Sequence, residues 1–219
     1  MPEAIELHEF FVEGGTPEQS HVLLHITEPS NREERRRGYF FALCEIKHGS
    51  REQIEAMQTI IDSLEKQYYA IDDTPGKDVF EVTLEHVNRR GHHILRHAKS
   101  SVHCIVGVVR ANSIVLSVHG TPEATLLYEE NDQIRHMNIV EPGGAERASD
   151  QLFSAVLQGS VNPGDYLYLA TPAVAHHFPI DRIEKFLASR TANQATSHVE
   201  KVLSALRSGD SYGGVLIHI

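Results

Sequence analysis

Helical and strand-like segments are grouped, not alternated, along this sequence. Two stretches with helical spacing follow each other: Ile54, Met57 and Leu64 share one face of the first, and Phe80 and Leu84 share one face of the second. Groups of short apolar segments lie before and after these two stretches. A doubly wound parallel sheet needs strands and helices that alternate, so this order favours an α+β fold with sheets and helices in separate layers.

The short apolar segments predict strands. We expect them over 3–13, 21–26, 39–46, 102–109, 114–119, 126–128, 134–139, 166–170 and 213–219, with a further apolar segment over 152–157. The 39–46 segment is almost entirely apolar, which predicts that both of its faces are buried. The polar residues 28–38 are expected to form a loop. No repeat or linker interrupts the chain, so we expect one domain over 1–219.

Three sequence pairs have the spacing of helix caps. They are Ser50 with Gln53, Asp181 with Glu184, and Thr191 with Gln194. In such a pair the first side chain accepts from the backbone near the start of the helix, and the second reaches back. They predict that helices begin near 50, 181 and 191.

Composition and charge exclude several classes of protein. Lys plus Arg is 20 and Asp plus Glu is 30, which gives a net charge of −10. A surface of this sign repels phosphates, so we expect no nucleic-acid partner. No apolar run approaches the roughly 18 residues of a membrane span, and the acidic start is unlike a signal peptide. We therefore expect no membrane partner.

Two cysteines and an excess of histidine also bear on the chemistry. Cys44 and Cys104 each lie in an apolar segment, where we expect buried thiols and a reducing, cytoplasmic setting. Among 15 histidines, His93 and His97 have the i, i+4 spacing that can chelate zinc. No third ligand follows them, and we expect both to lie on an exposed helical face. Asp165 stands in a Pro-Gly-Asp turn, where its carboxylate is expected to bond backbone amides.

Three segments resemble motifs of the metal-dependent protein phosphatase (PPM) family. Segment 159–173, Gly-Ser-Val-Asn-Pro-Gly-Asp-Tyr-Leu-Tyr-Leu-Ala-Thr-Pro-Ala, is similar to its "Gly-Asp, apolar strand, Thr-Asp-Gly" motif. Segment 118–126 is similar to its "strand, Gly-Asp-Ser-Arg, strand" hairpin, and 39–49 to its "apolar strand, Asp-Gly-x-Gly-Gly, helix" motif. The resemblance implies a four-layer α-β-β-α sandwich, in which two antiparallel sheets are flanked by helices.

The same resemblance implies two divalent cations bridged by aspartates, but most of those aspartates are missing here. The Asp-Gly pair falls on Glu45 and Ile46, and the aspartate of Thr-Asp-Gly falls on Pro172, which has no ligand atom. The early acidic segment keeps only Glu28, and the closing acidic pair keeps only Asp210, one position early. Glu45, Glu28 and Asp210 are therefore the candidate metal ligands, and Glu45 is otherwise an acid at a strand end near solvent.

Hard cations need several carboxylate oxygens at short range, so we expect no paired-metal centre, no resident cofactor and no catalytic residue. The main hypothesis is a non-catalytic binding or regulatory module with a protein partner. The alternative is an active serine/threonine phosphoprotein phosphatase that uses Mn²⁺ or Mg²⁺ in a rearranged site. A third possibility is an unrelated α+β module.

Overall fold

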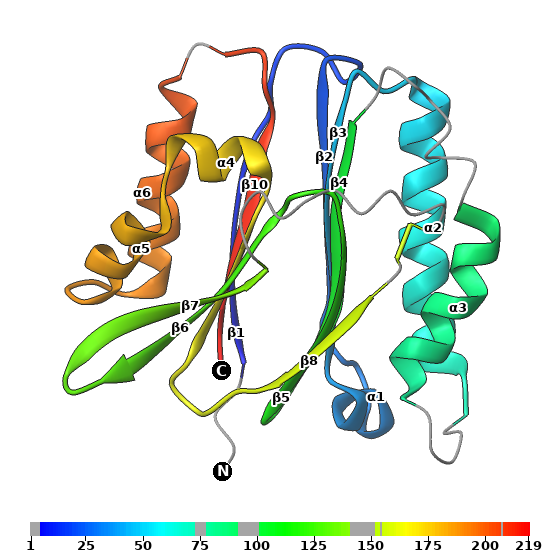
Figure 1. Cartoon of the computed structure of the whole chain (residues 1–219), viewed down its shortest axis with the longest axis horizontal. Coiled ribbons are helices and arrows are strands. Elements are labelled where there is room, and N and C mark those ends of the chain that lie inside the picture. The colour runs from blue at the N-terminus through cyan, green and yellow to red at the C-terminus, as the bar shows by residue number, and fades with distance from the viewer. Residues whose placement is uncertain (1–4, 73–77, 92–100, 141–151, 154, 207) are drawn as a thin grey trace.

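Two antiparallel sheets pack face to face between two layers of helices (Figure 1). The computed structural model describes residues 5–72, 78–91, 101–140, 152–153, 155–206 and 208–219. The α+β sandwich expected from the order of elements and from the family resemblance is confirmed.

Each sheet has five strands, and we name it by its first strand. The β2 sheet has the order β2 (Ser20–Thr27), β3 (Tyr39–Lys47), β4 (Ser101–Arg110), β5 (Ser113–His119) and β8 (Val156–Ser160). The β1 sheet has the order β1 (Glu6–Val12), β10 (Tyr212–His218), β9 (Tyr166–Ala170), β6 (Glu123–Glu130) and β7 (Gln133–Val140).

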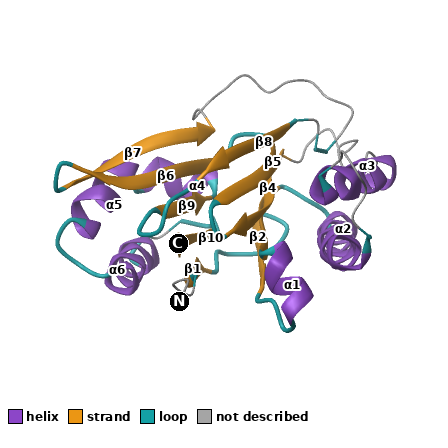
Figure 2. Ribbon diagram, turned by 90° about the horizontal axis from the view of Figure 1, so that it is seen from below, coloured by secondary structure: helices purple, strands orange, loops and turns teal. Residues whose placement is uncertain are grey.

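The helices form one layer on each outer face of the sandwich. Helices α2 (Arg51–Ala70) and α3 (Val79–Gly91) pack on the β2 sheet. Helices α4 (Pro172–His177), α5 (Ile180–Leu187) and α6 (Ala192–Ser204) pack on the β1 sheet. The short α1 (Arg32–Arg37) comes between β2 and β3 in the chain, and Figure 2 shows it beside β2.

Strand β3 shows why the sheets must be covered on both faces. Phe40 and Cys44 face the core under α2 and α3, whereas the alternate residues Phe41 and Leu43 face the other sheet. All four are at most 1% exposed. Side chains alternate between the two faces of a strand, so an all-apolar strand needs a partner layer on each side. The prediction of two buried faces for 39–46 is confirmed.

Capping residues in the sequence located the starts of two helices, whereas other expected boundaries differ from the structure. Ser50 accepts from the Gln53 backbone N–H, and Thr191 with Gln194 forms a complete capping box. The helix expected near 181 is α5, but its N-cap is Pro179 and Asp181 lies in the first turn, so the prediction that Asp181 caps the helix was wrong. Two more expectations were wrong: residues 28–38 contain α1, and the strand near 152–157 is β8, three to four residues later.

The cysteines are buried as expected, but they are not thiols. Cys44 and Cys104 stand directly opposite each other on β3 and β4 and form a disulfide, with Cα atoms 4.1 Å apart. The expectation of two free thiols was therefore wrong, and the cysteines no longer support a reducing compartment. Within the part of the chain that the structure describes, no helix is both long and apolar enough to cross a membrane.

Candidate metal centre at one end of the sheets

Two carboxylates and one ammonium meet where β3 ends and β10 begins, at the upper edge of the view in Figure 1. Glu45 and Lys47 are alternate residues of β3, so both side chains leave the same face of the strand, toward the other sheet. Asp210 lies just before β10. The Nζ atom of Lys47 is 3.4 Å from Oε1 of Glu45 and 3.3 Å from Oδ1 of Asp210. The ammonium thus stands between the two carboxylates.

Burial sets the electrostatics of this cluster. The Glu45 side chain is 0% exposed, whereas those of Lys47 and Asp210 are 29% and 33% exposed. Burial raises the pKa of Glu45, and the nearby Lys47 ammonium opposes that shift only in part. Burial also lowers the pKa of Lys47, but the carboxylates of Glu45 and Asp210 outweigh it, so the pKa of Lys47 is raised. The ammonium therefore stays charged across the neutral range.

Hydrogen bonds between distant segments place Asp210 beside Lys47. The Ser211 backbone N–H donates to Oγ of Ser20 at 3.0 Å, and the Ser211 hydroxyl donates to the Ser20 carbonyl at 2.8 Å. Ser20 is the strand partner of Lys47 on β2. The Gly14 N–H also donates to the Ser211 hydroxyl at 3.0 Å. These contacts hold the segment before β10 against the start of β2, and only the folded chain reveals them.

The segment that carries Pro172 also reaches this cluster, as the family resemblance implies. Thr171 is the N-cap of α4, and Pro172 is its first residue. The Ala173 backbone N–H lies 3.4 Å from Oε2 of Glu45, at the limit of a hydrogen bond. The Thr171 hydroxyl is buried without a hydrogen-bond partner among the described residues. Residues 171–173, at the start of α4, therefore reach Glu45 through a backbone N–H and contain no carboxylate.

The structure separates Glu28 from the other two candidates. Glu45 pairs with Val22 across β2 and β3, and Glu28 is exposed and lies six residues further along, beyond the end of β2. At about 3.3 Å a residue, that separation is about 20 Å. Glu28 therefore lies toward the opposite end of the sheet and cannot share an ion with Glu45. The view of Glu45 as an acid near solvent was also wrong, because its side chain is fully buried.

The donors at this end do not fit a pair of divalent cations. Among the described residues, no third His, Cys, Asp or Glu brings a ligand atom into a common group with Glu45 and Asp210. Each Mn²⁺ or Mg²⁺ prefers about six oxygen ligands, and two ions need carboxylates that bridge them. Lys47 places a positive charge where such an ion would have to bind. Among the described residues this end therefore offers two carboxylates and one ammonium, which are fewer oxygen ligands than two such ions need.

A second group of possible metal ligands lies on the other side of the β1 sheet. His136 on β7 and Asp181 and Glu184 on α5 bring one ligand atom each within 4.8 Å of one another. Nδ1 of His136 is 2.7 Å from Oε2 of Glu184, a hydrogen bond that already joins β7 to α5. No motif in the sequence predicts this group. Its only signal was the i, i+3 spacing of the two acids, because the partner histidine is about 45 residues away along the chain.

The remaining candidates from the sequence have other positions or roles. Asp165 accepts from the Asn162 N–H at 2.8 Å, so its predicted role in the turn is confirmed. Cys104 faces the core under α2 and α3 and is bonded to Cys44, so its role is structural. His93 and His97 lie outside the described residues.

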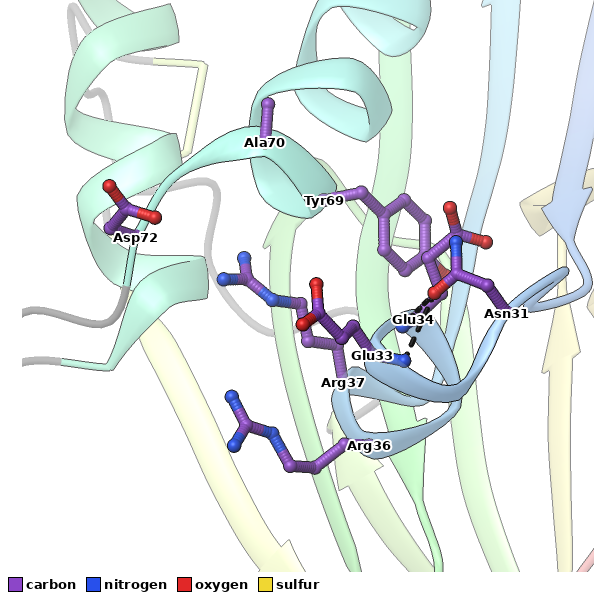
Figure 3. Close-up of a pocket in the computed structure, with 8 residues that line it drawn as sticks. All are labelled: Asn31, Glu33, Glu34, Arg36, Arg37, Tyr69, Ala70 and Asp72. Carbon is purple, nitrogen blue, oxygen red and sulfur yellow. Dashed lines mark hydrogen bonds between the residues drawn. The ribbon is translucent and has the colours of Figure 1, made fainter.

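A small pocket lies between α1 and the end of α2, near the start of β3 (Figure 3). It measures about 280 Å³, and charged side chains such as Glu33, Arg36 and Asp72 line it. Arg37 donates from its guanidinium to the carbonyls of Tyr68 and Ile71, at the last turn of α2. Cations at a helix C-terminus satisfy its free carbonyls, so Arg37 has a structural role.

Comparison with solved structures identifies the fold. A bacterial serine phosphatase superposes with a TM-score of 0.73 at 13% identity, covering 98% of this chain and 97% of that one. A serine/threonine phosphatase of S. agalactiae gives 0.71 at 12% identity, covering 99% of this chain and 100% of that one. The PPM Ser-Thr phosphatase MsPP of Mycobacterium smegmatis gives 0.68 at 11% identity, covering 98% of each chain.

The sequence itself matches no protein-family model and no curated protein. Identities this low show a shared architecture and leave the chemistry to be argued from the site. The chain therefore has the fold of the PPM-type serine/threonine phosphatases.

Proposed function

We propose that this chain is a PPM-fold module that has lost paired-metal catalysis and acts by binding, as a regulatory or scaffolding domain. The position of the Lys47 ammonium between Glu45 and Asp210 carries the proposal. The absence of a carboxylate at Pro172 supports it. If the domain were active, it would be a metal-dependent phosphatase, because that is the chemistry of the proteins that share its fold.

The chemistry of an ammonium explains why we do not expect hydrolysis of a phosphate ester. Paired divalent ions lower the pKa of a bound water and neutralise charge on the phosphoryl oxygens. An ammonium has no vacant coordination position for water. The single positive charge of Lys47 is already paired with the carboxylates of Glu45 and Asp210. On this proposal the fold keeps its frame, while the described residues at this end lack the paired ions' ligands that would activate a nucleophilic water.

We propose a protein as the binding partner. The pocket between α1 and α2 is small and lined by charges, unlike the larger apolar cavities that hold most small ligands. Strand β7 is an edge of the β1 sheet, and it carries Met137, whose side chain is 53% exposed. An edge strand with an exposed apolar side chain can accept a strand from another protein.

Hydrolysis of a phosphate ester tests the catalytic part. The purified chain is assayed with p-nitrophenyl phosphate and a phosphoserine peptide in the presence of Mn²⁺, Mg²⁺ or Zn²⁺. We expect no turnover above the metal-only blank. The alternative, an active phosphatase with a rearranged site, predicts metal-dependent turnover that Glu45→Ala abolishes. Glu200→Ala, at an exposed position of α6, is the matched control and would keep that turnover.

Crosslinking tests the binding part. A photo-crosslinking residue at position 137 in the full chain should give a discrete protein adduct in the native host, and the same residue at position 201, on exposed α6, should not. Equal labelling at both positions would contradict a binding edge at β7.

A further inference from the structure

We propose that the Glu45–Asp210 pair is a cation site whose resident cation is the Lys47 ammonium, and that Lys47 thereby keeps divalent ions out of it. This inference rests on the proposed function and names what fills the centre. It makes Lys47 the group that keeps divalent ions away from Glu45 and Asp210.

The geometry shows a site built around a positive charge. The two carboxylates come from β3 and from the segment before β10, which belong to different sheets, and the ammonium lies within 3.4 Å of both. Oε1 of Glu45 is buried and accepts no hydrogen bond from the described residues. Its charged partner is the ammonium of Lys47, 3.4 Å away. A buried carboxylate without a counter-charge is strongly unfavourable. Glu45 therefore needs a cation at this position if its carboxyl group is to be ionised.

Charge and tethering explain why Lys47 outcompetes a free ion. The two carboxylates carry −2 and Lys47 supplies +1, so a divalent ion would balance the pair more completely. The ammonium, however, is attached to the same strand as Glu45, two residues away. A tethered group acts at a high effective concentration, and a free ion must displace it from its carboxylates before it can bind.

Removal of the ammonium should therefore turn the pair into a divalent-cation site. Lys47→Ala leaves two carboxylates around the space that the side chain vacates. The side chain of Asp210 is 33% exposed, so an ion from solvent can reach the pair. Carboxylate oxygens and water are the ligands that Mn²⁺ and Mg²⁺ prefer. We expect one ion and not two, because no third acidic ligand joins the pair among the described residues.

Calorimetric titration with Mn²⁺, together with thermal melting, tests this inference on the full chain. Lys47→Ala should bind one more Mn²⁺ per chain than the wild type, and its melting temperature should rise as Mn²⁺ is added. Lys47→Arg keeps the positive charge and should gain no ion. Lys201→Ala removes an exposed lysine of α6 and should also gain none. The double variant Lys47→Ala/Glu45→Gln should lose the added ion, which would place it at the pair.

Each outcome decides the question. A folded Lys47→Ala variant that binds no more Mn²⁺ than the wild type overturns the inference. If Lys47→Ala folds only with metal, refolding should succeed in Mn²⁺ and fail in EDTA, and failure in both overturns it. The proposed function fails on a different result, namely turnover by the wild type. A gain of Mn²⁺ by Lys47→Ala alongside an inactive wild type supports both proposals.

Discussion

Replacing Lys47 with methionine should destabilise the fold because it leaves the buried Glu45 carboxylate without its counter-charge. Breaking a buried ion pair by removing one partner costs about 3–5 kcal/mol. Glu45 is 0% exposed, but Lys47 is 29% exposed, so we take the lower end, about 3 kcal/mol. For a chain of this length each kcal/mol shifts the melting temperature by about 2–4 °C, which predicts a fall of about 9 °C.

The assay is urea unfolding of four proteins: the wild type, Lys47→Met, Glu45→Gln and the double variant. Glu45→Gln keeps the shape and leaves Lys47 paired with Asp210, so it should cost less than Lys47→Met. In the double variant no buried charge remains unpaired, and its cost should be at least about 1 kcal/mol below the sum of the single costs. Additive costs, or a Lys47→Met variant within about 0.5 kcal/mol of the wild type, would show that Lys47 does not stabilise the buried Glu45 carboxylate.

Three further predictions concern other parts of the molecule. Burial raises the pKa of Glu123 to about 7, so the folded state holds a proton that the unfolded state releases near 4.5. Stability should therefore fall by up to about 3 kcal/mol as pH rises from about 4.5 to 7, and urea unfolding of Glu123→Gln should show a flatter pH profile. The disulfide closes a loop with a separation of 60 residues, so Cys44→Ser/Cys104→Ser should unfold about 4 kcal/mol more easily. The unreduced wild type should show no free thiol when it is denatured and alkylated. Gly107→Ala would place a Cβ 2.6 Å from the Val115 carbonyl oxygen, and denaturant unfolding should show a loss of about 1–3 kcal/mol.

The layers of the fold were predictable because they follow from local pattern. Segment 39–46 is apolar on both faces except at Glu45, and two amphipathic helices follow it. A sheet covered on both sides is the arrangement that buries them. Helix α1 was not predictable from its run of charged residues. It depends on the Asn31 cap and on Arg37, which bonds the end of α2, a segment that follows it by more than 30 residues.

The candidate site was predictable only in part. Glu45 and Asp210 both lie beside Lys47. The family resemblance predicted this, because it matched the segments that carry them to the family's acidic motifs. Glu28 was wrong because its segment was assigned to the end of β2, whereas the start of β2 lies at the site. Lys47 was missed, although its i, i+2 spacing from Glu45 on a predicted strand places both on one face. That Asp210 would fold back onto Lys47 depends on Ser211 and its bonds to Ser20, which no local pattern shows.

We propose that an ammonium, and not a pair of metal ions, fills the acidic end of this sandwich. Calorimetric titration of the wild-type chain with Mn²⁺, monitored against Glu45→Gln, tests it most directly. We expect the two proteins to bind the same amount of Mn²⁺, because Glu45 pairs with Lys47 and with no metal ion. Two tight Mn²⁺ ions per wild-type chain, both lost in Glu45→Gln, would contradict it.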